Sequence, residues 1–106
     1  MEIILLYVPC SNTKEAKTIA VRLLQEKLCG CVNIIPMVKT LFLWPPHAGK
    51  IEETKEAILL IKTVKTKYTK LEKMISKLHS YDTPCILKIV ANATAPFYQW
   101  LSKELK

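Results

Sequence analysis

The sequence has 106 residues, and its thiol and imidazole groups carry most of its chemical potential. These groups are Cys10, Cys29, Cys31, Cys85, His47 and His79. Thiolate and imidazole ligands together suit copper or zinc. However, Cys29 and Cys31 lack the C-x-x-C spacing of redox or structural zinc sites, and two histidines cannot build a three-histidine catalytic zinc site. Metal chemistry is therefore open to this chain, but no linear motif fixes it.

Each of these residues also has a purely structural interpretation. Free cysteine usually behaves as a small buried hydrophobic residue, so we expect four free thiols, with Cys10 and Cys85 buried. His79 follows a predicted helix, where the helix dipole would favour a protonated imidazole as a cap, with metal ligation as the alternative. Trp44 and Trp100 are expected to be packing residues, with a ligand platform as the alternative.

Several classes of protein are excluded by composition. With two glycines the chain contains neither G-x-x-x-x-G-K-[ST] nor G-x-G-x-x-G, and it has no H-E-x-x-H, so we predict no enzyme activity. The net charge is +7, but Arg22 is the single arginine. Nucleic-acid recognition favours arginine, because its planar guanidinium group can form two parallel hydrogen bonds. We therefore predict a solvated lysine surface and no nucleic-acid partner.

The apolar segments indicate one globular domain over residues 1–106. Half of the residues are hydrophobic, which excludes a disordered chain. No apolar run reaches the roughly 18 residues of a membrane span, and the N-terminal segment lacks the basic head of a signal peptide. We expect a cytoplasmic protein without a membrane partner.

Hydrophobic periodicity predicts alternating strands and helices. A strand over 3–8 stops at Pro9, and Asn12 with Glu15 forms a capping box for a helix that ends at Gly30. Strands over 31–44 and 50–63 form a hairpin, with Pro36 at a bulge or at a change of partner. A helix over 66–79, a strand over 85–90 and a short C-terminal helix follow. This βαββαβ order plus a C-terminal helix predicts an α+β ferredoxin-like split βαβ sandwich.

The length of the hairpin predicts self-association. Each arm would run about 40 Å at roughly 3.3 Å per residue, whereas a compact chain of this size has a radius of gyration near 13 Å. An apolar arm left in water is prone to aggregate, and a second copy of the chain is the simplest cover. We therefore predict a closed homo-oligomer.

Five segments together resemble the CutA divalent-cation tolerance family. They are residues 26–36, 49–52, 56–63, 79–84 and 98–101, with Trp44 between the first two. The resemblance implies a ferredoxin-like subunit that forms a homotrimer through strand pairing between subunits. It also implies a role in tolerance to copper and other divalent metals, with no metal required for folding.

The resemblance further implies a cleft between subunits, formed by Cys31, Trp44, Glu56, Lys62, His79 and Tyr81. The chain departs from the family pattern at Ser80, where proline is usual, and at Cys85, where glutamate is usual. A thiol in place of a carboxylate favours soft metals such as Cu(I). We predict Cys31, His79 and Cys85 as metal ligands, and Trp44, Glu56, Lys62 and Tyr81 as a ligand cleft.

An alternative function is a small-molecule sensor resembling the PII-type signalling trimers, which share this subunit fold. In that case Lys62 and the lysines around the 66–79 helix would bind a small anionic ligand.

Overall fold

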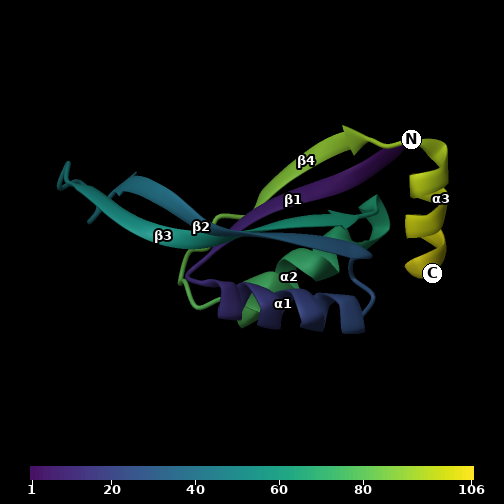
Figure 1. Cartoon of the computed structure of the whole chain (residues 1–106), viewed down its shortest axis with the longest axis horizontal. Helices are drawn as coiled ribbons and strands as arrows, with labels where there is room; N and C mark the ends of the chain where they lie inside the picture. Colours follow the sequence, from purple (N-terminus) through teal and green to yellow (C-terminus); the bar gives the residue numbers. More distant parts are fainter.

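The structure, a computed structural model, describes all 106 residues and contains one four-stranded antiparallel sheet, with two helices packed on one side and a third at one end (Figure 1). The elements are β1 (Glu2–Cys10), α1 (Thr13–Gln25), β2 (Cys31–Leu43), β3 (Ile51–Thr63), the 3-10 helix η1 (Lys65–Lys67), α2 (Tyr68–Leu78), β4 (Leu87–Asn92) and α3 (Ala95–Glu104). The strand order is β2-β3-β1-β4. The predicted α+β class and element order are confirmed.

The main core lies between the sheet and the two helices α1 and α2. Side chains alternate between the two faces of a strand, so Leu6 and Val8 of β1 point to the helices together with Leu59 and Ile61 of β3. The facing stripes of α1 and α2 complete this core, with Ala16, Ile19, Ala20, Leu23, Leu71 and Ile75 buried. Ile3, on the opposite face of β1, packs instead against Leu101 and Leu105 near the C-terminus.

Helix α1 is shorter than predicted. It ends at Gln25 with Glu26 as its C-cap, and Lys27 adopts the left-handed conformation with φ 54. The prediction that Gly30 stops the helix is therefore wrong. Gly30 instead extends the sheet, since its N–H donates to the Lys62 carbonyl, and a Cβ there would lie 2.5 Å from Leu101 Cδ1. A side chain at this position would therefore force the buried Leu101 of α3 to shift.

Strand β1 continues through Pro9, contrary to the prediction that this proline stops it. Pro9 pairs with Ile58 of β3, whereas the pairing of β1 with β4 ends at Tyr7. The Pro9 carbonyl points away from β3, because it accepts a hydrogen bond from His79. The N and C=O of a strand residue point to the same side, so the proline nitrogen faces the side where β4 is absent.

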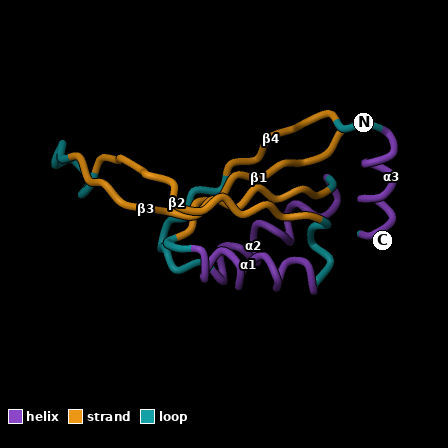
Figure 2. Tube along the Cα trace, viewed as in Figure 1, coloured by secondary structure: helices purple, strands orange, loops and turns teal.

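The β2–β3 hairpin projects well beyond the helical layer (Figure 2). The molecule measures 47 × 24 × 23 Å, in agreement with the predicted projecting hairpin. A register shift between Ile35 and Val38 confirms the bulge at Pro36, and Met37 there has φ 59. Apolar side chains on the projecting part are exposed, with Leu43 at 71% and Ile51 at 72%.

The second half of the chain differs from prediction at its boundaries. The predicted 66–79 helix is divided into η1 and α2, and β4 begins at Leu87 rather than at Cys85. Helix α3 lies at the far end of the sheet from the hairpin tip, where Leu101 and Leu105 pack against Ile3 (Figure 1). No helix is long and apolar enough to cross a membrane.

Candidate functional site

A cluster of three potential metal ligands forms where β1 ends. Cys10 is the last residue of β1, Glu15 lies in the first turn of α1, and His79 is the C-cap of α2. One ligand atom from each of the three side chains lies within 4.8 Å of the others. Thiolate, carboxylate and imidazole are all ligands of zinc, and thiolate and imidazole also suit copper.

Both ring nitrogens of His79 are hydrogen-bonded. Nε2 lies 2.8 Å from the Pro9 carbonyl oxygen, and the Tyr81 N–H donates to Nδ1 at 3.0 Å. A ring that accepts at Nδ1 and donates at Nε2 is neutral. His79 is thus the C-cap of α2, at the helix end as predicted, and its ring ties α2 to β1.

Glu15 joins three segments through its carboxylate. Oε1 accepts hydrogen bonds from the Ser11 N–H and hydroxyl, both at 2.9 Å, and Oε2 accepts from the Ser80 N–H at 2.8 Å. Partial burial alone would raise the pKa of Glu15, but the hydrogen bonds from Ser80 and Ser11 outweigh it and lower the pKa to about 2. The capping box is confirmed on one side only, since Asn12 accepts from the Glu15 N–H while Glu15 bonds Ser11.

Cys10 is the buried member of the cluster, as predicted. Burial raises the pKa of its thiol to about 12, and the charges of Glu15 and Glu56 add to the increase. Its closest polar contact is the Val8 carbonyl at 3.9 Å, so the sulfur makes no strong hydrogen bond. A metal bound to Cys10 Sγ would displace the thiol proton, and one bound to His79 Nδ1 would displace the Tyr81 N–H. His79 would keep its hydrogen bond from Nε2 to the Pro9 carbonyl, as metal-bound histidines usually do. The donor set fits a zinc or copper ion.

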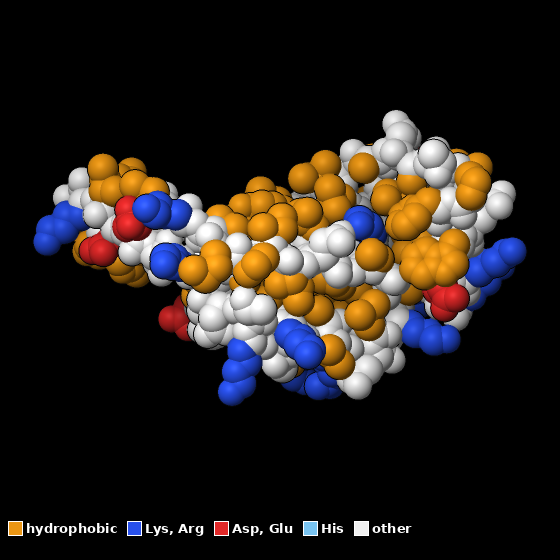
Figure 3. Space-filling view, in the orientation of Figure 1, with side chains coloured by type: hydrophobic (Ala, Val, Ile, Leu, Met, Phe, Trp, Pro, Cys, Tyr) orange, Lys and Arg blue, Asp and Glu red, His pale blue; other side chains and the backbone are white.

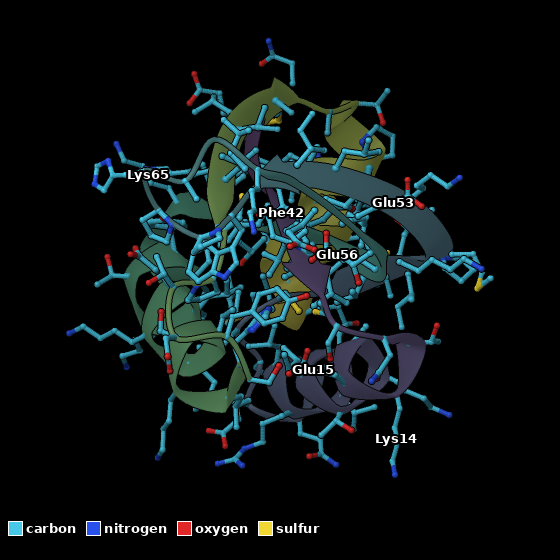
Figure 4. All side chains as sticks on the ribbon, turned by 90° about the vertical axis from the view of Figure 1, so that its left-hand side faces the viewer. Lys14, Glu15, Phe42, Glu53, Glu56 and Lys65 are labelled. Carbon is cyan, nitrogen blue, oxygen red and sulfur yellow. The ribbon has the colours of Figure 1, made fainter.

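A cleft of about 740 Å³ opens beside this cluster, between the projecting hairpin and the 81–85 segment. It brings together three residues of the predicted ligand cleft, Trp44, Glu56 and Tyr81. Its other walls are formed by Tyr7, Pro9, Thr40, Phe42, Thr54, Asp82, Thr83 and Cys85. Figure 4, which looks from the hairpin end of the molecule, shows Glu56 beside Phe42, with Glu15 nearer the helices.

Glu56 and Tyr81 form a hydrogen-bonded pair in the wall of the cleft. The Tyr81 hydroxyl donates to Glu56 Oε2 at 2.7 Å. Burial, together with this bond to a carboxylate, raises the pKa of Tyr81, so its hydroxyl stays protonated and remains a donor. The Tyr81 ring also packs against the His79 ring, with 4.7 Å between the ring centroids. This contact connects the cleft to the metal-ligand cluster.

Lys62 and Cys31 lie elsewhere on the sheet within one chain. The Lys62 ammonium contacts Cys31 Sγ at 3.7 Å and donates to Asn33 Oδ1. Lys62 is six positions along β3 from Glu56, a separation of about 20 Å. One chain therefore does not bring Lys62 into the cleft, nor Cys31 to His79, and both assignments remain predictions.

Cys85 lies in the cleft wall rather than in the core. It is exposed, so the expectation that it is buried is wrong, although all four cysteines are free as predicted. The prediction of Cys31, His79 and Cys85 as a ligand set omitted Cys10 and Glu15. The capping pattern of Glu15 was visible in the sequence, but no sequence signal placed either residue beside His79.

The fold and these two neighbouring sites define an α+β protein with a projecting hairpin and a cluster of potential metal ligands. Comparison with known proteins identifies its family. Residues 4–104 match the family described as CutA1 divalent ion tolerance protein. The chain belongs to this family.

Relatives of known structure share the fold over the full chain. The divalent-cation tolerance protein CutA of Archaeoglobus fulgidus is 35% identical over 95% of this chain and 96% of its own length. Its structure, described as that of a periplasmic protein, superposes with a TM-score of 0.89 at 34% identity, with full coverage of both chains. The CutA1 structure from Ehrlichia chaffeensis gives 0.92 at 30% identity, over 98% of this chain and 95% of that one.

Some relatives are longer than this chain. It matches the CutA homolog of Xenopus laevis at 33% identity over 90% of its own residues, but spans 62% of that protein.

Proposed function

We propose that the protein is a cytoplasmic, non-catalytic homotrimer that contributes to metal tolerance by binding copper or another divalent metal ion. The single observation that carries the proposal is the cluster of Cys10, Glu15 and His79, whose donor atoms lie within 4.8 Å of one another. The cluster combines soft and hard ligands, which suits copper and zinc better than calcium or magnesium.

Assembly is supported by the apolar surface that one chain leaves uncovered. Figure 3 shows hydrophobic side chains along the strand side of the molecule and, mixed with charged ones, on the projecting hairpin, while basic side chains project from the helical side. Leu41, Leu43 and Ile51 are each more than half exposed. Contiguous exposed apolar surface of this kind marks interaction sites in soluble proteins. Closed assembly of three copies would cover it.

Two ligand sets compete for the metal, and both include His79. The first is the cluster within one chain, in which Cys10 and Glu15 would hold the ion with His79. The second is the predicted set of Cys31, His79 and Cys85, for which neighbouring subunits would have to supply Cys31. A bound ion would supply Lewis acidity and positive charge, and the surrounding hydrogen bonds would orient its ligands.

Calorimetric titration of reduced protein with Cu(I) and with Zn²⁺ tests the proposal. Cys10→Ser, Cys31→Ser and Cys85→Ser are compared, since each replaces one sulfur by oxygen. Affinity that falls at least tenfold in Cys10→Ser alone supports the cluster within one chain. A loss confined to Cys31→Ser and Cys85→Ser supports the set between subunits. Absence of binding to the unmodified protein contradicts a metal-binding function.

The PII-like alternative receives no support from the cleft. None of its lining residues is lysine or arginine, so within one chain the cleft offers no cationic group to an anionic ligand.

A further inference from the structure

Glu56 is a buried carboxylate without a counter-ion. Its residue is 8% exposed, and its one protein hydrogen bond is the Tyr81 hydroxyl on Oε2. The ion pairs of the chain are Arg22–Glu26 and Lys39–Glu53, neither of which involves Glu56. The other carboxylate oxygen, Oε1, accepts no hydrogen bond from the protein, and it is not fully enclosed, so a ligand can reach it. Because burying a charge without a positive partner is costly, the free oxygen favours a cation beside it.

The cleft around Glu56 has the composition of a cation site. Its charged residues are Glu56 and Asp82, and none of the 16 basic residues of the chain lines it. Four aromatic rings line the same space, those of Tyr7, Phe42, Trp44 and Tyr81. The faces of aromatic rings attract positive charge, and tryptophan does so most strongly. Trp44 is 56% exposed at the cleft, so its ring is accessible.

We infer that this cleft binds an organic ammonium ion, specifically a primary amine. Its N–H groups donate to Glu56 Oε1, and its carbon skeleton packs against Phe42 and Trp44. A hard metal ion suits the cleft less well, because such ions take six or more oxygen ligands, preferably carboxylates, and Glu56 and Asp82 are the only carboxylates that line it. The cleft volume of about 740 Å³ accommodates a ligand larger than a single ion.

The inference rests on the proposed function in one respect, since the cleft must stay open when subunits assemble. It does not depend on metal binding by the cluster within one chain, because Cys10, Glu15 and His79 do not line the cleft. Cys85 of the second ligand set does line it, so Cys10→Ser is the variant that removes a metal ligand without changing the wall of the cleft.

Calorimetric titration of the metal-free protein with phenethylamine and 2-phenylethanol tests the inference. The two probes have the same shape and differ in charge, since the amine is protonated at neutral pH. We expect phenethylamine to bind at least tenfold more tightly, because a charge-assisted hydrogen bond to a carboxylate is much stronger than a neutral one. In Glu56→Gln the two affinities become equal.

Glu53→Gln is the matched control, because it makes the same change of charge on the opposite face of β3. In the register of the hairpin Glu53 pairs with Leu41, whereas the cleft residues Thr54 and Thr40 pair with each other. This variant should keep the tenfold preference. Trp44→Leu provides a second test that leaves the buried carboxylate in place, and it should weaken the binding of both probes.

Three results would overturn the inference. They are equal affinities of the unmodified protein for the two probes, binding of neither probe, and a preference for the amine that survives in Glu56→Gln. Binding of neither probe together with destabilised subunit assembly in Glu56→Gln would show that a cationic side chain of a second copy already occupies the cleft.

Discussion

Replacing Glu15 by glutamine tests how strongly one carboxylate holds the start of α1 to the segment after α2. The pKa of Glu15 falls from 4.5 to about 2 in the folded chain. At 1.36 kcal/mol per pKa unit, this shift sets an upper limit of roughly 3 kcal/mol on the contribution of the charged form. Glu15 is only partly buried, so screening by water reduces the expected loss in Glu15→Gln to about 1–2 kcal/mol at pH 7.

The pH dependence gives this prediction its direction. A carboxylate with a lowered folded pKa stabilises the fold above its unfolded value near 4.5, and this contribution is lost as the pH falls towards 2. Urea unfolding of metal-free protein at one fixed concentration, from pH 7 down to pH 3, measures the difference between Glu15→Gln and the unmodified chain. The difference should shrink below pH 5.

Glu26→Gln is the control for this experiment. It lies just after the same helix and pairs with Arg22 at 2.8 Å, but both side chains are more than 40% exposed. Surface pairs of this kind contribute at most about 1 kcal/mol, with 0.3–0.5 kcal/mol typical for a helix pair. A loss in Glu15→Gln no larger than that in Glu26→Gln, or one that stays constant down to pH 3, would refute the reasoning.

Three further predictions follow from packing and burial. Gly30→Ala should lower the free energy of unfolding by about 1–3 kcal/mol in urea titrations, because its Cβ would lie 2.5 Å from an α3 side chain; an unchanged value contradicts this. Iodoacetamide should label Cys85 in the folded protein but Cys10 only after unfolding, since burial raises the pKa of Cys10 to about 12; equal rates by mass spectrometry would contradict it. Tyr81→Phe should cost about 1–3 kcal/mol, because Glu56 loses its only donor; thermal and urea unfolding would both report the change.

The element order was predictable from the sequence because it follows from local patterns. The apolar run of β1, the helical stripe of α1 and the two long arms of the hairpin each show their own periodicity. The bulge at Pro36 was predictable for the same reason, since a residue without an N–H cannot continue a ladder of hydrogen bonds. These features depend on neighbours in the sequence.

The incorrect boundaries depend on contacts between distant segments. Gly30 has the residue type of a helix stop, but it packs against α3, where a side chain would force Leu101 to shift. Pro9 has the residue type of a strand end, but β4 stops early and leaves its nitrogen on an unpaired side. Neither the position of α3 nor the length of β4 can be read from the residues around Gly30 or Pro9.

The candidate sites were predicted only in part. The resemblance grouped Trp44, Glu56 and Tyr81, and these three residues line one cleft of the single chain, although the hairpin and the 81–85 segment are far apart in the sequence. Their role in binding a ligand stays a prediction. Cys10 was expected to be a buried thiol, and it is buried, but its place beside His79 depends on how α2 packs against the end of β1.

The most direct test of the central claim is the mass of the protein in solution. Multi-angle light scattering on a chromatography column should give about 36 kDa, three times the 12.1 kDa of one chain, at micromolar concentration. That mass would show that copies of the chain cover the exposed hairpin. A stable particle of 12.1 kDa under the same conditions would contradict the account, because Leu43 and Ile51 would then remain in water without a partner.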